Sequence, residues 1–364
     1  MLHSARVQRE TAASVLDLGF HASRRKATMW SIALLSVLVL SMLAGTLVGA
    51  TGTSLSSVGA VLNHHLLGGA YSSDSFRVHD AIIWDIRIPR VILAAVVGAG
   101  LALAGAIMQV LVRNMLADPY VLGVNSGASC GAAAALLFGV GAGFGDYALQ
   151  GSAFVGSLVA SLLIFFVAKG AGRISSTRLL MSGVAIGYML SAATSFLVFS
   201  SDSAEGARSV MFWLLGSLGL ASWNGPLAVI VCIVCAALAL LMVIAPQLDA
   251  LNAGDETALT LGVSPDRLRI VLLLITCLLV GSIVAMAGSI GFIGLVIPHL
   301  SRRIVGGTHR LMLPITALLG AILLIWADVA ARTLLAPQEI PIGIITALIG
   351  APFLLILVRR MHAY

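Results

Sequence analysis

Charged side chains are scarce in this sequence of 364 residues. Aspartate, glutamate, lysine and arginine together make up 10% of the chain, whereas hydrophobic residues make up 59%. An ordinary soluble domain has about 25% charged and roughly 45–50% apolar residues. A water-soluble globule could not cover its surface with so few charges. The composition therefore excludes that class and indicates an integral membrane protein.

Lysine and cysteine are also rare. The 21 basic residues include two lysines, Lys26 and Lys169, so the basic clusters that bind nucleic acid are absent. Neither lysine has the glycine-rich context of a P-loop, which excludes ATP hydrolysis by this chain alone. The 4 cysteines all fall in apolar stretches, an arrangement that argues against a disulfide framework.

Long charge-free runs dominate the rest of the sequence. A helix needs about 20 apolar residues to cross the hydrocarbon core, and nine runs between charged residues are long enough to be candidates. The run 270–301 is long enough for two helices, with a break after Gly288. The run 209–248 predicts a short non-crossing helix followed by one span. The sequence thus predicts an all-α polytopic membrane protein with ten transmembrane helices in residues 28–360.

The distribution of basic residues predicts the orientation. The first span, about 28–50, has a longer apolar core than a signal peptide, so we expect it to be retained. With both termini inside, 16 of the 21 basic residues fall in inner segments, as the positive-inside rule favours. Residues 1–27 and 361–364 are therefore predicted to be cytoplasmic. The outer basic residues would be Arg77, Arg87, Arg90, Arg208 and Arg332.

Two segments suggest an internal duplication. Residues 97–107 read VGAGLALAGAI and residues 280–290 read VGSIVAMAGSI, with six identities at an offset of 183 residues. These segments belong to the second and seventh predicted spans, which cross the membrane in opposite directions. Inverted repeats of this kind are typical of transporters, whose two halves move about a site near the midplane.

The source of energy is expected to lie outside the chain. An ion-coupled carrier needs ionisable residues within its spans, and almost none occur here. Asp328 is the main exception, and its spacing from Arg332 predicts an ion pair on one helical face near the outer end. A separate cytoplasmic ATPase is therefore the expected motor. A secondary transporter and a non-transporting membrane receptor remain the alternatives.

The longest polar inner segment, residues 247–269, predicts a docking element for a cytoplasmic partner. A polar insert of this length with its own helix is more often functional than a plain connector. We expect one short amphipathic helix in which Asp255 and Glu256 are exposed. Its apolar side would comprise Leu251, Ala258, Leu259 and Leu261.

Nearly the whole chain resembles the permease subunits of type II ABC importers, which take up iron siderophores, haem and cobalamin. Met115 stands where the family usually has proline, and the segment before Met29 is longer than typical. The matching segments are RIPR at 87–90, GAIMQ at 105–109, RNMLADPYVLGVNSGAS at 113–129, TRLLMSGVAIG at 177–187, GSIGFIGLVIPHLSRR at 288–303, DVAAR at 328–332 and EIPIGIITALIGAPFLLILVRR at 339–360.

The resemblance implies a type II ABC importer permease fold of ten helices in a bacterial cytoplasmic membrane. It implies a second permease subunit, identical or different, and two cytoplasmic ATPase subunits that bind ATP and Mg. A periplasmic or lipid-anchored binding protein would deliver the cargo. The chain itself would hold no catalytic group, metal or cofactor. Iron siderophore is the expected cargo, with haem and cobalamin as the alternatives in the same family.

The resemblance also implies roles for individual residues. The residues that dock the binding protein would be Arg87, Arg90 and Arg332. The residues that couple to the ATPase would be Leu251, Asn252, Gly254, Asp255, Glu256, Leu259 and Gly262. The residues of the cytoplasmic gate would be Asn114, Leu116, Ser176 and Thr177. Three histidines could touch a haem-bearing partner or its cargo, but we expect His64 and His65 to be solvated and His299 to make a structural hydrogen bond.

Overall fold

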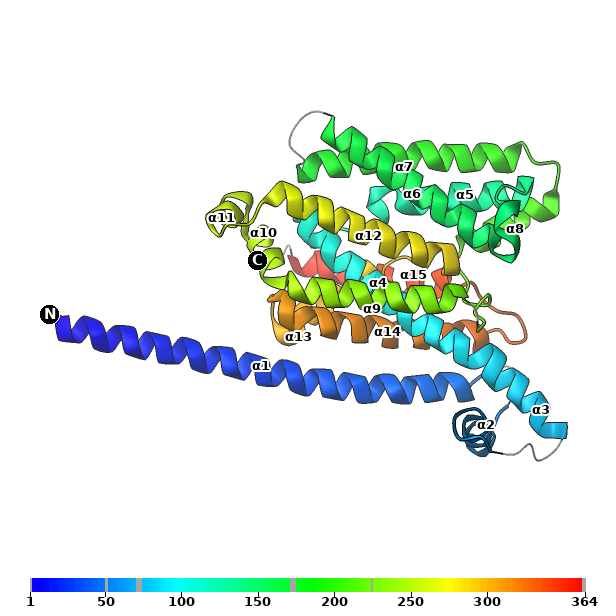
Figure 1. The fold of residues 1–364 in the computed structure, drawn as a ribbon, viewed down its shortest axis with the longest axis horizontal. Coiled ribbons are helices and arrows are strands. Elements are labelled where there is room, and N and C mark those ends of the chain that lie inside the picture. The colour runs from blue at the N-terminus through cyan, green and yellow to red at the C-terminus, as the bar shows by residue number, and fades with distance from the viewer. Residues whose placement is uncertain (1, 50–51, 70–73, 171–174, 224, 362–364) are drawn as a thin grey trace.

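A computed structural model describes residues 2–49, 52–69, 74–170, 175–223 and 225–361, and within these ranges the chain is helical without strands (Figure 1). The all-α prediction is therefore confirmed. The predicted tail 361–364 lies outside the described residues apart from Met361. The helices are α1 Leu2–Leu47, α2 Leu55–Leu67, α3 Asp74–Asp80, α4 Ile88–Val112, α5 Val124–Phe138, α6 Ala148–Lys169, α7 Ser176–Phe199, α8 Ala204–Leu214, α9 Gly225–Val243, α10 Ala245–Ala253, α11 Asp255–Thr260, α12 Pro265–Ala287, α13 Ile293–Val305, α14 His309–Thr333 and α15 Ile342–Met361.

The polytopic architecture is confirmed, with helices of two lengths. Among the described residues, 7 helices are long and apolar enough to cross a membrane, and they are α1, the helix containing α4, α6, α7, α9, α12 and α14. The shorter helices α5 and α15 are also apolar. A tenth span at α13, which has 13 residues, stays a prediction. The predicted boundary between residues 27 and 28 falls inside α1, which runs along one side of the bundle (Figure 1).

The predicted breaks fall at glycines. Helix α12 ends at Ala287, and Gly288 then takes φ +66°, which an L-residue rarely adopts, before α13 begins. The run 209–248 contains a short helix and one full span, as predicted. The short helix α8 begins earlier than the charge-free run because it includes Glu205 and Arg208 on its exposed side.

The second span begins earlier than the sequence predicted. A π-helical stretch, Ala81–Arg87, joins α3 to α4, so one helix extends from Asp74 to Val112. The first half of this helix carries Asp85, Arg87 and Arg90. Because of these charges, the charge-free run starts only at residue 91, well after the helix begins. Charge alone does not end a membrane helix when its side chains are paired within the bundle.

The two repeated segments lie at the centre of the bundle. In Figure 1, α4 and α12 run in opposite directions beside each other, as an inverted repeat requires. Both are largely buried by the surrounding helices. The repeats differ within the matched stretch, because the second copy breaks at Gly288 whereas α4 continues through the equivalent Gly105 to Val112.

Two glycine contacts allow α4 to pack closely against its neighbours. A Cβ on Gly98 would lie 2.2 Å from the carbonyl oxygen of Gly320 on α14. A Cβ on Gly105 would lie 1.9 Å from the carbonyl oxygen of Gly294 on α13. Small residues at such crossings let helix backbones approach in a membrane, where van der Waals packing drives association.

Replacing Gly105 with alanine is expected to destabilise the permease. The methyl group would overlap the backbone of α13, which cannot move aside as a flexible side chain would. The loss should reach the upper end of the roughly 1–3 kcal/mol typical of overpacking. Thermal unfolding in detergent measures the loss. Gly143→Ala is the control, because its Cβ would meet no atom within 4 Å. Equal stability of the two variants would contradict this packing.

Candidate functional site

The predicted inner end of the bundle, defined here as the end with α10 and α11, carries two short helices where the sequence predicted one. The two helices are α10, Ala245–Ala253, and α11, Asp255–Thr260, and they meet at Gly254. Gly254 has φ +134° and ψ 158°, a conformation that is essentially restricted to glycine. The segment therefore bends sharply at one residue. The single-helix prediction is wrong because the hydrophobic spacing did not reveal this backbone conformation.

The apolar side of this segment is divided between two surfaces. Leu251 and Ala258 are buried against the bundle, as expected. Leu259 and Leu261 are instead exposed, at 51% and 66%, which corrects their placement with the buried residues. Together they form an exposed apolar surface on a polar segment. The predicted coupling residues Asn252, Glu256 and Gly262 are also exposed beside them.

Asp255 joins this segment to the rest of the bundle. Arg269, which is buried in α12, donates hydrogen bonds from Nη2 and Nη1 to its two carboxylate oxygens at 2.8 and 3.1 Å. Arg113, at the end of α4, donates to Oδ1 of the same carboxylate. Partial burial favours the neutral acid, but both arginines outweigh it and lower the pKa of Asp255. The side chain of Asp255 is 44% exposed, as predicted, and it is also paired with both arginines.

A second contact joins α10 to α14. The backbone N–H of His309 donates to Oδ1 of Asp249 at 3.0 Å, and Nδ1 of the same histidine lies against that oxygen. His309 is the first residue of α14 and is buried. The two short helices are thus held at two points, one on each side of Gly254.

The predicted gate residues gather where α4 ends and α7 begins. Arg113 has φ +52° and ends α4, and the next residue, Asn114, accepts the backbone N–H of Leu116 at 2.9 Å. Ser176 donates its hydroxyl to the carbonyl oxygen of Leu111 at 2.6 Å. The structure thus brings Asn114, Leu116 and Ser176 to one corner. Asn114 and Thr177 are exposed there.

Arg113 connects the gate corner to the α10–α11 segment. It precedes Asn114 directly and is paired with Asp255 on α11. One ion pair therefore links α11 to the residue next to the gate corner. Sequence reasoning missed Arg113 because it appeared as one of many inner arginines, and its partner lies 142 residues away in the chain.

The opposite end holds a buried network of charges. Arg90 donates from Nε to Asp328 at 2.9 Å and from both terminal nitrogens to Glu339 at 2.9 Å each. Asp328 also pairs with Nε of Arg332 at 3.0 Å, which confirms the predicted pair. Arg332 donates further to the backbone of α1 near Gly45. This outer network joins α1, α4, α14 and the segment before α15.

The three predicted docking arginines are all less than 9% exposed. Arg87 donates from its guanidinium group to the carbonyl oxygens of Thr46 and Leu47 at 2.9 Å each. The guanidinium group is therefore already hydrogen-bonded to the end of α1. Docking through Arg87, Arg90 and Arg332 stays a prediction. The exposed outer arginines are instead Arg77 and Arg208.

The outer histidines belong to an aromatic cluster on α2. His65 stacks on Trp84 with ring centroids 3.9 Å apart, and its Nε2 lies 2.8 Å from Asp80. The ring of His64 meets Phe76 edge to face. Simple solvation of these two histidines is therefore wrong. The expected hydrogen bond of His299 is absent at Nε2, which is buried without a partner among the described residues.

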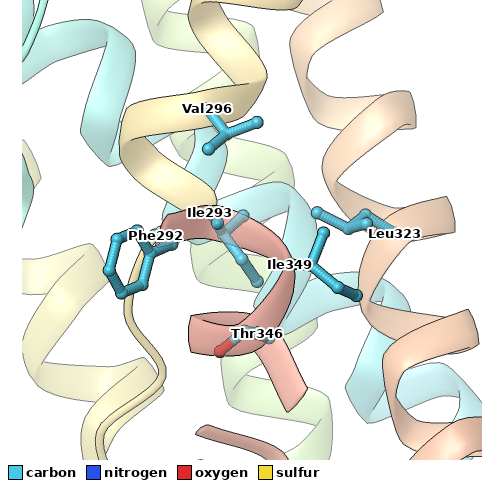
Figure 2. A pocket seen from close by; sticks show the side chains of 7 residues that line it. Phe292, Ile293, Val296, Leu323, Thr346 and Ile349 are labelled. Atoms are coloured by element: carbon cyan, nitrogen blue, oxygen red, sulfur yellow. The ribbon is translucent and has the colours of Figure 1, made fainter. Parts of the chain in front are cut away.

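The cavity between α13, α14 and α15 is too small for a cargo. Figure 2 shows Phe292, Ile293 and Val296 near Leu323 and Ile349 around this cavity. Its volume is about 10 Å³, which is room for roughly one water molecule. A chelate would need a passage elsewhere, such as a space between two subunits.

Comparisons with known proteins agree on one group. The model of the FecCD transport family matches residues 33–360. The hemin transport system permease protein HmuU of Yersinia pestis is 44% identical over 284 residues, covering 77% of this chain and 84% of the relative. The cobalamin import system permease protein BtuC of Halobacterium salinarum is 42% identical over 278 residues, covering 76% of this chain and 73% of the relative.

A solved structure matches almost the full length. It is an inward-facing conformation of a metal-chelate type ABC transporter, and it is 32% identical with a TM-score of 0.78. The match covers 91% of this chain and 98% of the solved chain. The arrangement of helices in Figure 1 is therefore shared with that transporter.

Proposed function

Because the chain belongs to the FecCD transport family and is the permease of an ABC importer, we propose that its cargo is chelated iron, carried as an iron siderophore. ATP would be hydrolysed, with Mg, on two separate cytoplasmic subunits. The cargo class is supported by the family and its relatives. The observation that supports an external motor is the Asp255–Arg113 ion pair, because it connects an exposed segment to the gate corner. Such a connection is what a permease needs when its motor lies outside the chain.

The secondary-transporter alternative is not favoured by the outer network. A proton or sodium relay needs an ionisable group that can exchange its ion. Asp328 is instead buried between Arg90 and Arg332, both within 3.0 Å. Each oxygen of the carboxylate therefore already faces a guanidinium group, which leaves no open position for a transported ion.

The relatives support a cargo class more firmly than one cargo. Their names include hemin, cobalamin and metal chelate, all of them large complexes in which the metal is already bound. A permease for such a cargo needs a wide passage rather than metal ligands of its own. Haem is the second candidate, because HmuU is 44% identical to this chain.

We propose a cycle in which the α10–α11 segment transmits motion. ATP binding draws the two ATPase subunits together, and the apolar surface at Leu259 and Leu261 moves with them. The passage between two permease subunits then opens outward and receives cargo from a periplasmic or lipid-anchored binding protein. Hydrolysis returns the gate corner to its starting position. Both termini lie in the cytoplasm in this arrangement.

Uptake measurements test the proposed cargo. Iron-labelled siderophore, haem and labelled cobalamin are supplied separately to a strain without this gene and to its complemented control. Loss of siderophore uptake, restored by the gene, is the expected result. Loss of haem uptake alone would assign the second candidate. If all three uptakes persist, purified permease with its ATPase must be assayed for transport, and no ATP-dependent flux there would overturn the proposal.

Charge reversal of the outer arginines tests the docking prediction. Arg87→Glu and Arg332→Glu are expected to weaken binding of the delivery protein by about tenfold, since lost charge complementarity across an interface costs more than ~1 kcal/mol. Affinity for the reconstituted complex and substrate-stimulated ATPase activity measure the effect. Both arginines are buried, so only variants with normal thermal stability count.

Arg208→Glu serves as the matched variant at the same end, because its side chain is exposed on α8. If Arg208→Glu weakens docking while a stable Arg87→Glu protein binds normally, the docking surface lies on α8. That result would contradict the role predicted for the buried arginines.

A further inference from the structure

An apolar groove lies between α6 and α12 on an exposed face of the bundle. Its volume is about 490 Å³, within the range of ligand-binding pockets. Leu158 and Leu162 of α6 and Leu274 and Leu278 of α12 stand at its mouth and are exposed. The remaining lining residues are Phe154, Ser157, Ser161, Phe165, Ile270, Leu273 and Cys277.

The groove is apolar despite its two serines. Ser157 donates its hydroxyl to the carbonyl oxygen of Phe154 at 2.7 Å, and Ser161 donates to that of Ser157 at 2.7 Å. Both hydroxyls are therefore satisfied by their own helix. The groove closes near Gly281, where an added Cβ would lie 2.3 Å from Oγ of Ser157. A hydrocarbon chain fits such a lining, whereas a polar ligand would find no partner.

Two cations stand at the other end of the groove. Lys169 is the last residue of α6, and its Nζ lies 5.5 Å from the ring centroid of Phe165 in the lining. Arg267 is in the first turn of α12, on the same face as Ile270 three residues later. Both side chains are exposed. The two helices that form the groove thus each place one positive charge at its predicted inner end.

We propose that this groove is a binding site for an anionic phospholipid. One acyl chain occupies the apolar groove, and the phosphate lies between Lys169 and Arg267. Basic pockets between transmembrane helices on the cytoplasmic side bind acidic lipid headgroups in this way. The site rests on the proposed orientation of the chain. It is independent of the cargo and of the ATPase.

The lipid would act next to the α10–α11 segment. Helix α12 begins at Pro265, directly after that segment, and it carries Arg269, the buried partner of Asp255. A headgroup held by Arg267 would therefore fix the first turn of α12. An acidic lipid is expected to stabilise the connection between the segment and the bundle.

Native mass spectrometry of the purified permease–ATPase complex tests the site. The complex is titrated with phosphatidylglycerol or with phosphatidylcholine of the same acyl chains. We expect preferential retention of phosphatidylglycerol. Lys169→Gln and Arg267→Gln should each lower its affinity about fivefold, and the double variant about 30-fold, since each basic residue near the surface contributes a similar amount. Retention of phosphatidylcholine should not change.

Two further variants separate charge from shape. Leu162→Trp fills the mouth of the groove and is expected to lower retention of both lipids. Arg310→Gln removes an exposed arginine from the first turn of α14 at the same end and should leave lipid binding unchanged. Equal retention of the two lipids, or equal losses in Arg310→Gln and Lys169→Gln, would overturn the proposal.

A second copy of the chain is the competing occupant. Cross-linking between two subunits through Leu162→Cys would show that the groove lies in the permease pair, and this too would overturn the lipid site. Lipid retention is measured without transport. A complex that binds phosphatidylglycerol but imports no chelate would therefore contradict the proposed function and leave this inference standing.

Discussion

Asp255→Asn is expected to leave ATP hydrolysis largely intact while import falls about tenfold, the effect of roughly 1.4 kcal/mol of lost coupling. The asparagine keeps the size of the side chain but removes the charge that holds Arg113 and Arg269 together. Movement of α11 would then no longer be transmitted to the gate corner. Transport and ATPase rates of the reconstituted complex, taken as a ratio, measure this coupling.

The neighbouring residue provides the control. Glu256 lies on the same short helix and has an exposed side chain. Glu256→Gln removes the same charge and should keep the ratio of transport to hydrolysis near that of the wild type. If both variants lower the ratio equally, the effect comes from the partner surface rather than from the ion pair.

A double-mutant cycle distinguishes the two arginines. Arg113→Gln should lower coupling as much as Asp255→Asn, and the combined variant should be no worse than Asp255→Asn, because both changes remove the same Asp255–Arg113 pair. Additive losses would contradict a direct connection between Asp255 and the gate corner. Arg269→Gln is less informative, because Arg269 is buried and also lies 4.0 Å from Asp266.

Asp328→Asn is expected to cause the largest loss of stability. Its side chain is 2% exposed and pairs with both Arg90 and Arg332. Removing the carboxylate leaves two buried guanidinium groups without their shared anion. Breaking a buried pair in this way costs about 3–5 kcal/mol. The denaturant concentration that unfolds half of the detergent-solubilised permease should fall accordingly.

Glu339→Gln tests whether burial sets the size of this loss. Its carboxylate also pairs with Arg90, but its side chain is 51% exposed. Solvent screens this pair, and we expect a cost of at most ~1 kcal/mol. If the two variants lose equal stability, the network is held by something other than the buried carboxylate.

The fold could be predicted from the sequence because hydrophobic runs report directly on membrane crossing. The break at Gly288 and the short helix before α9 followed from glycine and proline positions. The early start of the second span was missed. Its Arg90 is neutralised by Asp328 and Glu339, which are 238 and 249 residues away, and no local pattern reveals such pairs.

The candidate site was less accessible to sequence reasoning. The α10–α11 segment could be found from its polarity, but the exposure of Leu259 and Leu261 depends on the bend at Gly254. The role of Asp255 depends on Arg113, which is distant in the chain. The pairing of these residues depends on contacts between helices that are distant in the sequence, and composition does not reveal such contacts.

The bend at Gly254 also bears on the timing of transport. Helix α10 is attached to α14 in the second repeat, whereas α11 is attached to α4 in the first repeat and to α12 in the second. Glycine lets the angle between the two short helices change without breaking either contact. A movement of the ATPase subunits against the α10–α11 segment would therefore be transmitted to both repeats at the same time. The two halves of a subunit would then switch together, with no stable state in which only one of them has moved.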